Sequence, residues 1–146
     1  MFKGHRLHLP PSLLSLGNNS VNIDFEAEYV TDCQGMHWFK DEEDQLEYIY
    51  TQSEPDHSHI WFPCFDQPDL KAPYSLLVLA PKSWVVVSTT GGIILDKATA
   101  KVAYQNFGVT NQMKNSFGTN EYLVHEFDKS APISTYLYCI CAGPFE

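Results

Sequence analysis

The sequence is 146 residues long, the size of a single domain, and 44% of its residues are hydrophobic. Its formal net charge is −9, from nine Lys and Arg against 18 Asp and Glu. Because nucleic-acid binding needs a basic surface, this balance argues against DNA or RNA as a partner, and no apolar run reaches the roughly 18 residues of a membrane span.

The first predicted strand covers residues 21–29, where apolar and polar residues alternate without error. One face carries Val21, Ile23, Phe25, Ala27 and Tyr29, and the other carries Asn22, Asp24, Glu26 and Glu28. A second strand is predicted over residues 46–52, after an acidic turn at residues 40–44.

Two prolines among aromatic residues predict an ordered but irregular loop over residues 61–69. Strands over residues 74–80 and 84–89 are then predicted to form a hairpin around Pro81. The remaining predicted elements are strands over residues 93–95, 101–107, 121–127 and 135–142, the last covered on both faces. No segment of ten or more residues shows a clean helical period, so the sequence predicts one mostly antiparallel β domain.

Acidic side chains dominate the sequence from Asp24 to Asp56, where Lys40 is the sole basic residue. One interpretation is a solvated loop and strand face. The other is a negative potential that attracts cationic groups, such as the amino terminus of a peptide. The sequence alone leaves both open.

Four cysteines are present, at Cys33, Cys64, Cys139 and Cys141, and none forms a C-x-x-C pair. They are expected to be free thiols in a reducing compartment, which predicts an intracellular and in particular cytoplasmic protein. The first 20 residues lack acidic side chains and are rich in Leu and Ser, so a mitochondrial location is the alternative.

Four segments resemble the N-terminal domain of the aminopeptidase N family of zinc metallo-aminopeptidases. Tyr48–Pro55 (YIYTQSEP) is similar to that family's YxYTQxEP strand, and Phe62–Ala72 (FPCFDQPDLKA) is similar to its FPCFDEPDLKA loop. Ala80–Ser88 (APKSWVVVS) and Pro132–Leu137 (PISTYL) also match in order and spacing, the latter followed by a G-x-F sequence. The sequence departs from the family at Gln67, where Glu is common, and at Ser58–His59, near the position of an Ala-Arg pair.

The resemblance implies a fold made of the antiparallel sheets of a saddle-like domain. It covers nearly the whole chain from about Leu9, and the family's domain has further strands before and after the matched region. Residues 1–146 are therefore expected to form a single, partial domain. Its incomplete sheet is expected to be covered by a protein partner, either a catalytic aminopeptidase domain or a larger assembly.

The resemblance also implies two substrate-binding residues, Gln52 and Glu54. In the family, the Glu of the TQxE sequence recognises the free amino terminus of the substrate, and the Gln lines the pocket for the first side chain. A carboxylate in a sheltered cleft can bind an ammonium group by a charge-assisted hydrogen bond. The simpler interpretation of Glu54 is an ordinary surface acid at the end of a strand.

The zinc-binding and catalytic sequences of the family, HExxH and GxMEN, are not found in this chain. The nearest match is His125-Glu126, but Lys129 stands where the second His is required, and the segment alternates like a strand. No catalytic residue and no metal ligand are therefore assigned, and zinc is expected only in a separate catalytic domain. The chain is expected to be inactive alone.

Two functions remain open. The chain is either the substrate-recognition domain of a zinc aminopeptidase, as a fragment or split subunit that binds peptide N-termini, or a truncated domain recruited as a structural subunit of a larger assembly. Retention of Gln52 and Glu54 favours the first function, and the partial domain favours the second.

Overall fold

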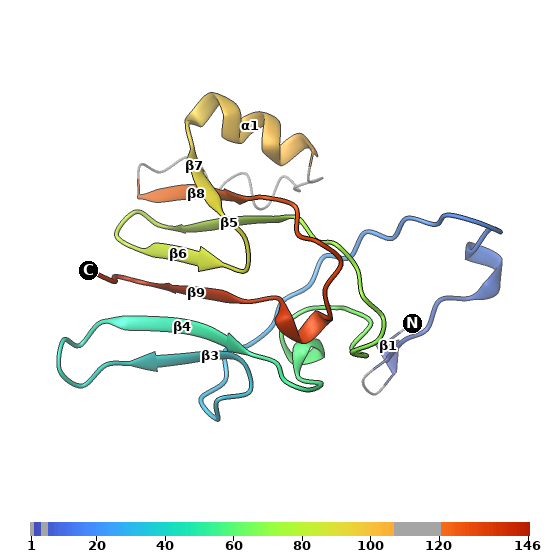
Figure 1. Ribbon diagram of the computed structural model, residues 1–146, viewed down its shortest axis with the longest axis horizontal. Coiled ribbons are helices and arrows are strands. Elements are labelled where there is room, and N and C mark those ends of the chain that lie inside the picture. The colour runs from blue at the N-terminus through green and yellow to red at the C-terminus, as the bar shows by residue number, and fades with distance from the viewer. Residues whose placement is uncertain (1, 4–5, 107–120) are drawn as a thin grey trace.

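The computed structural model describes residues 2–3, 6–106 and 121–146, and these consist mainly of β-strands (Figure 1). Two antiparallel sheets form the body of the molecule, as the sequence predicts. A short hairpin, β1 (Phe2–Lys3) and β2 (Arg6–Leu7), lies in an N-terminal arm with the 3₁₀ turn η1 (Pro11–Leu13). The arm extends to one side of the sheets (Figure 1).

The larger sheet has four strands in the order β3-β4-β9-β6. They are β3 (Gly35–Lys40), β4 (Glu47–Gln52), β9 (Ile140–Gly143) and β6 (Val85–Ser88). The acidic turn joins β3 to β4, and the carboxylate of Asp41 accepts the backbone N–H of Glu43 at 2.7 Å. Such Asp-to-backbone bonds are typical of tight turns and explain part of the local acidity.

The smaller sheet has three strands in the order β5-β8-β7. They are β5 (Leu76–Pro81), β8 (Tyr122–Phe127) and β7 (Gly92–Leu95). The helix α1 (Lys97–Asn106) follows β7 and packs Ala100, Ala103 and Tyr104 on this sheet. Its first turn is capped by Asp96, whose carboxylate accepts the backbone N–H groups of Ala98 at 2.8 Å and Thr99 at 3.0 Å. These bonds lower the pKa of Asp96.

The main hydrophobic core joins the two sheets. Its buried members come from both of them and are Ile49, Ala80, Val86, Phe127, Ile140 and Ala142. Trp38, Trp61 and Trp84 are partly buried against this cluster. A core that draws on strands far apart in sequence fixes the end of β4 relative to the loop that follows it.

Several predicted elements are confirmed, and others are wrong. The strands predicted over residues 46–52 and 121–127 correspond to β4 and β8. The predicted hairpin is wrong, because β5 pairs with β8 whereas β6 pairs with β9. The backbone N–H of Trp84 does bond to the carbonyl of Pro81 at 2.9 Å, so the turn exists but carries the chain from one sheet to the other.

Two further strand predictions are wrong in type. Residues 97–106 form α1, where a strand was predicted from residue 101, and residue 107 lies outside the described residues. The predicted strand over residues 135–142 is divided into the 3₁₀ turn η3 (Thr135–Leu137) and β9. Ala103 and Tyr104 of α1 and Ile140 and Ala142 of β9 are buried. Short apolar runs of this kind do not distinguish a helix from a strand.

The alternating segment of residues 21–29 is not a strand in the structure. All of these residues are exposed, and no ladder includes them. Strand β3, which follows this segment in the chain and was not predicted from the sequence, pairs with β4 and not with residues 21–29. An alternating sequence specifies which faces a strand would have, but the strand forms only where a neighbour pairs with its backbone.

Candidate substrate-recognition site

Gln52 and Glu54 lie on either side of a buried residue at the end of β4. Gln52 is the last residue of the strand and lies opposite Gly35 of β3. Ser53 is 3% exposed, whereas Gln52 and Glu54 are exposed. This pattern presents the amide and the carboxylate outward, two residues apart, from a backbone that is held in place by Ser53.

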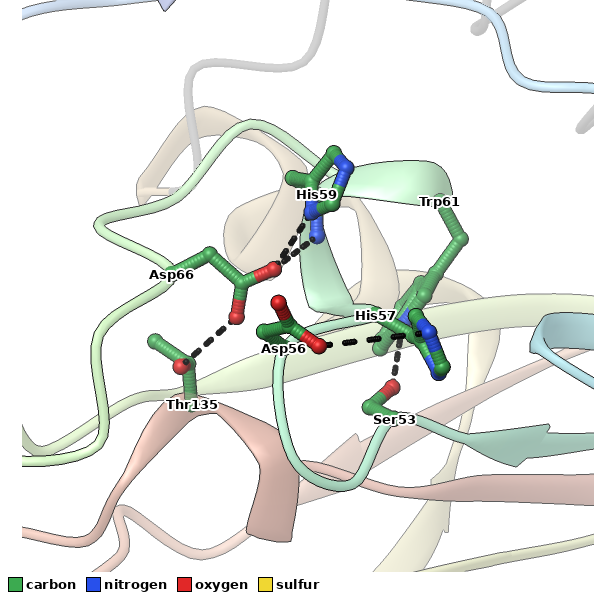
Figure 2. A network of polar contacts seen from close by, with 7 residues as sticks. All are labelled: Ser53, Asp56, His57, His59, Trp61, Asp66 and Thr135. Carbon is green, nitrogen blue, oxygen red and sulfur yellow. Dashed lines mark hydrogen bonds and ion pairs between the residues drawn. The ribbon is translucent and has the colours of Figure 1, made fainter. Parts of the chain in front are cut away.

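Ser53 is fixed by two hydrogen bonds. Its hydroxyl accepts the indole N–H of Trp61 at 3.0 Å (Figure 2), and its carbonyl accepts the backbone N–H of His57 at 2.9 Å. The second bond closes a turn that contains a cis peptide bond between Glu54 and Pro55. The turn leads directly into the 3₁₀ turn η2 (Ser58–Ile60).

Asp66 connects η2 to two other segments. One oxygen of its carboxylate accepts the backbone N–H of His59 at 2.9 Å and faces His59 Nδ1 at 2.6 Å (Figure 2). Its other oxygen accepts the hydroxyl of Thr135, in η3, at 3.4 Å. The side chain of Asp66 is 9% exposed and that of His59 is 39% exposed. His59 therefore makes a local contact close to where the resembling family has an arginine.

The loop of residues 62–72 is held against the C-terminal part of the chain. The hydroxyl of Ser134 donates to the carbonyl of Pro68 at 2.5 Å, and the hydroxyl of Tyr138 donates to the carbonyl of Ala72 at 2.8 Å. Phe62 stacks near Tyr138, with ring centroids 5.9 Å apart. Phe65, in contrast, is 79% exposed, so it does not belong to the core.

Glu54 is one of two exposed acidic residues in the turn that follows β4. Its carboxylate has no hydrogen bond or ion pair with any residue in the described part of the chain. Asp56 is also exposed, and the nearby His57 lies 3.9 Å from the Asp56 carboxylate (Figure 2). An exposed carboxylate that has no cationic partner among the described residues can accept one from a ligand.

Comparison with known proteins identifies the family. Residues 3–137 match the peptidase M1 N-terminal domain. The chain belongs to this family. The peptidase M1 N-terminal domain was the family expected from the four sequence segments, and the match confirms that expectation. Within the described residues, no helix is long and apolar enough to cross a membrane.

Relatives of this M1 N-terminal domain include three enzymes from distant organisms. Aminopeptidase N of Streptomyces lividans is 29% identical over 145 residues, which is 99% of this chain and 14% of that protein. Leucyl aminopeptidase of Saccharolobus solfataricus is 29% identical over 126 residues, 86% of this chain and 13% of that protein. Human glutamyl aminopeptidase is 29% identical over 98 residues, 67% of this chain and 8% of that protein. The chain thus spans a small part of the length of each relative.

Gly35 is a residue of the site region that sequence analysis missed. It faces Gln52 across the β3–β4 ladder and has a φ of +65°, in the left-handed region that favours glycine. A Cβ on Gly35 would lie 2.9 Å from Cγ2 of Ile60 in η2. A lone glycine just before an aromatic-rich run is the signal that could have found this close approach.

His125 and Glu126 of this M1 domain lie on β8, as the alternation of that segment predicts. His125 is 6% exposed, and burial lowers the pKa of its imidazole. Among residues 2–3, 6–106 and 121–146, no three His, Cys, Asp or Glu side chains are grouped so that they could hold a metal ion. The described residues therefore do not fit zinc, and none is assigned to it.

Proposed function

We propose that this chain is the substrate-recognition domain of a zinc aminopeptidase. In this proposal Glu54 binds the ammonium group at the N-terminus of a peptide, and Gln52 contacts the first side chain. The catalytic residues and the zinc ion belong to a separate domain that lies against this one. The observation that carries the proposal is the pair of exposed side chains, Gln52 and Glu54, on a fixed backbone within the TQxE sequence.

The family match supports this function at the level of the whole protein. The printed names of the relatives are aminopeptidase N, leucyl aminopeptidase and glutamyl aminopeptidase. An aminopeptidase must distinguish the end of a chain from its interior. A carboxylate does so because only the terminal residue carries an ammonium group, and a charge-assisted hydrogen bond to it is about twice as strong as a neutral one.

The rigidity of the turn supports the same role. Ser53 is anchored by Trp61 and His57, and η2 is anchored by Asp66. Groups that are held in position before the ligand arrives lose less conformational entropy on binding. The loop of residues 62–72 thus has a structural role in the proposal, as the support of the turn that carries Glu54.

The test is a kinetic comparison of Glu54→Gln with Glu47→Gln in the aminopeptidase formed by this chain and its catalytic part. Both residues are exposed glutamates on or next to β4, so the two variants make the same change in charge. Hydrogen bonds to charged groups contribute about 1.5–3 kcal/mol, so we expect Glu54→Gln to raise KM about 10-fold or more. Glu47→Gln should leave KM within about twofold. Equal kinetics for Glu54→Gln and the wild type would remove the recognition role.

The alternative is a structural subunit of a larger assembly. It is favoured by the exposed apolar side chains of residues 21–29, which include Phe25 at 54% and Tyr29 at 56%. This function predicts that Glu54→Gln has no effect on any activity of the assembly. It also predicts that changes in residues 21–29 prevent assembly, and so the two functions are separable by experiment.

A further inference from the structure

The larger sheet ends in a row of side chains that includes Gln52. Gln52 of β4 pairs with Gly35 of β3 on one side. On the other side β4 runs antiparallel to β9, with Tyr50 opposite Cys141. The same register, continued by two residues, places Gln52 opposite Cys139, which directly precedes β9. Figure 1 shows that β9 begins at the end of the sheet where β4 finishes.

Two hydrogen bonds hold the start of β9 beside both of its neighbours. The backbone N–H of Ile140 donates to the hydroxyl of Thr51 in β4 at 3.0 Å. The backbone N–H of Cys139 donates to the hydroxyl of Thr89, the residue after β6, at 3.2 Å. The Thr89 hydroxyl also lies 3.4 Å from the Cys139 thiol. The row therefore continues from Gln52 through Cys139 to Thr89.

Gln52 and Cys139 lie on the same face of the sheet. Ile140 is buried in the main hydrophobic core, so Cys139 and Cys141 on either side of it face away from that core and are partly exposed. Ile49 of β4 belongs to the same core, and Gln52 is three residues further along the strand. Because side chains alternate between the two faces, Gln52 also faces away from the core.

The row offers an amide, a thiol and a methyl group, and it includes no acidic or basic side chain. The hydroxyl of Thr89 is occupied, because it donates to the carbonyl of Leu137 at 2.8 Å and accepts the backbone N–H of Cys139. A free cysteine behaves as a small, polarisable apolar group. A charged group placed against this row would lose water without gaining a partner from it, whereas an uncharged apolar group would not.

We propose that Cys139, together with Gln52, determines which first side chain a substrate peptide can have. With the ammonium group of the peptide bound at Glu54, its first side chain rests against Gln52 and Cys139. Residues directly opposite each other on adjacent strands have Cβ atoms roughly 5 Å apart, so one side chain can contact both. The preferred substrates are peptides with an uncharged, apolar first residue such as leucine or methionine. The specificity role of Cys139 rests on the proposed function, in which Gln52 contacts the first side chain.

Disulfide trapping tests the geometry in the chain alone. In the Gln52→Cys variant, mild oxidation should join the new thiol to Cys139, because residues opposite each other in a ladder have Cα separations in the range of a disulfide. Mass spectrometry of the digested protein identifies the bond. In the control Glu47→Cys, at the other end of β4, the new thiol should not join Cys139. Absence of the bond in Gln52→Cys, or equal yields in the two variants, would overturn the assignment.

Charged thiol reagents test specificity in the aminopeptidase that contains this chain. One methanethiosulfonate adds an ethylammonium group and another adds an ethylsulfonate group, and mass spectrometry measures the labelling of Cys139. The ratio of kcat/KM for substrates that begin with Glu to that for substrates that begin with Lys should be at least about 10-fold higher after the first reagent than after the second, because opposite charges attract and like charges repel. The control Cys139→Ser keeps Cys33, Cys64 and Cys141, and the two reagents should leave its ratios equal within about twofold.

The role of Cys139 and the role of Glu54 can fail separately. Glu54→Gln should raise KM for Glu and Lys substrates alike, because each carries the same terminal ammonium group. If it does so but the two reagents give equal ratios, or Cys139 is not labelled, the specificity role is overturned and the proposed function stands. A shift of the same size in Cys139→Ser would assign the effect to another thiol and would also overturn it. A shift that needs Cys139, with unchanged KM in Glu54→Gln, would support the specificity role and remove amine recognition.

Discussion

Asp66 is predicted to be the residue whose loss most weakens the turn that carries Glu54. Asp66→Ala removes two good hydrogen bonds, to the backbone N–H of His59 at 2.9 Å and to its imidazole at 2.6 Å. It also removes the contact to the Thr135 hydroxyl, which at 3.4 Å contributes little. Hydrogen bonds to a charged acceptor contribute about 1.5–3 kcal/mol each. The bond between the His59 ring and Asp66 should contribute less than this, because the ring is partly exposed and solvent screens the interaction. We therefore expect a loss of about 3 kcal/mol.

The assay is urea unfolding of the chain followed by tryptophan fluorescence. His59→Ala should cost about 1 kcal/mol, because the backbone N–H of residue 59 keeps its acceptor. In the Asp66→Ala background the same His59→Ala change should cost less than in the wild type, since the contact with the Asp66 carboxylate is already gone. Asp69→Ala is the control, because Asp69 is exposed in the same loop and its side chain makes no hydrogen bond with the described residues.

Two results would refute the reasoning. One is an Asp66→Ala protein within about 0.5 kcal/mol of the wild type, which would mean that the carboxylate is replaced by water without loss. The other is an His59→Ala effect of equal size in both backgrounds, which would show that the two side chains are not coupled.

Three further predictions concern the sheets and the thiols. Gly35→Ala should lower the free energy of unfolding in urea by about 2–3 kcal/mol, because the residue has a φ of +65° and the new Cβ would lie 2.9 Å from Ile60. The control Gly17→Ala, which has a φ of +95° but no atom within 4 Å of the new Cβ, should lower it by about 1 kcal/mol. Equal losses in the two variants would show that the contact with Ile60 has no effect. Burial lowers the pKa of His125, so the folded state binds a proton at this imidazole less readily than the unfolded state, which takes one up below about pH 6.5. The free energy of unfolding should therefore fall as the pH drops below 6.5, by at most about 1.4 kcal/mol per pH unit, and His125→Leu should flatten this dependence when both proteins are melted from pH 7 to pH 5. In iodoacetamide labelling followed by mass spectrometry, the exposed Cys33 should react first. Cys64 should react at least about 100-fold more slowly, because burial and then the charge of Asp66 raise the pKa of its thiol to about 12. Equal labelling rates, or a disulfide among the four cysteines, would contradict this prediction.

The sequence predicts the parts of the fold in which local pattern and long-range pairing agree. Strands β4 and β8 were predicted within one residue. The β8 segment alternates, the β4 segment is rich in aromatic and β-branched residues, and both strands are paired on both sides. Residues 21–29 alternate just as clearly but have no pairing partner, and so a perfect local pattern did not produce a strand. Strand β5 pairs with β8 across a long stretch of sequence, and such pairing leaves no mark in a local window.

The candidate site was predictable where it depends on a short motif and not where it depends on packing. Gln52 and Glu54 are proposed from one contiguous sequence, and the structure places both at exposed positions, Gln52 at the end of β4 and Glu54 two residues after it. The groups that hold them, namely Gly35, Trp61 and the Asp66–His59 pair, come from other segments. Their contribution depends on contact geometry, which composition and periodicity do not specify.

The most direct measurement of the amine-recognition role is a thermodynamic cycle between Glu54 and the α-amino group of an inhibitor. A peptide-like competitive inhibitor and its analogue with hydrogen in place of the amino group are titrated against the aminopeptidase that contains this chain, as wild type and as Glu54→Gln. If Glu54 binds the ammonium group, removal of the amino group should weaken inhibition at least about 10-fold more in the wild type than in the variant, which corresponds to about 1.4 kcal/mol of coupling. An equal loss in both enzymes would contradict the proposed role of Glu54.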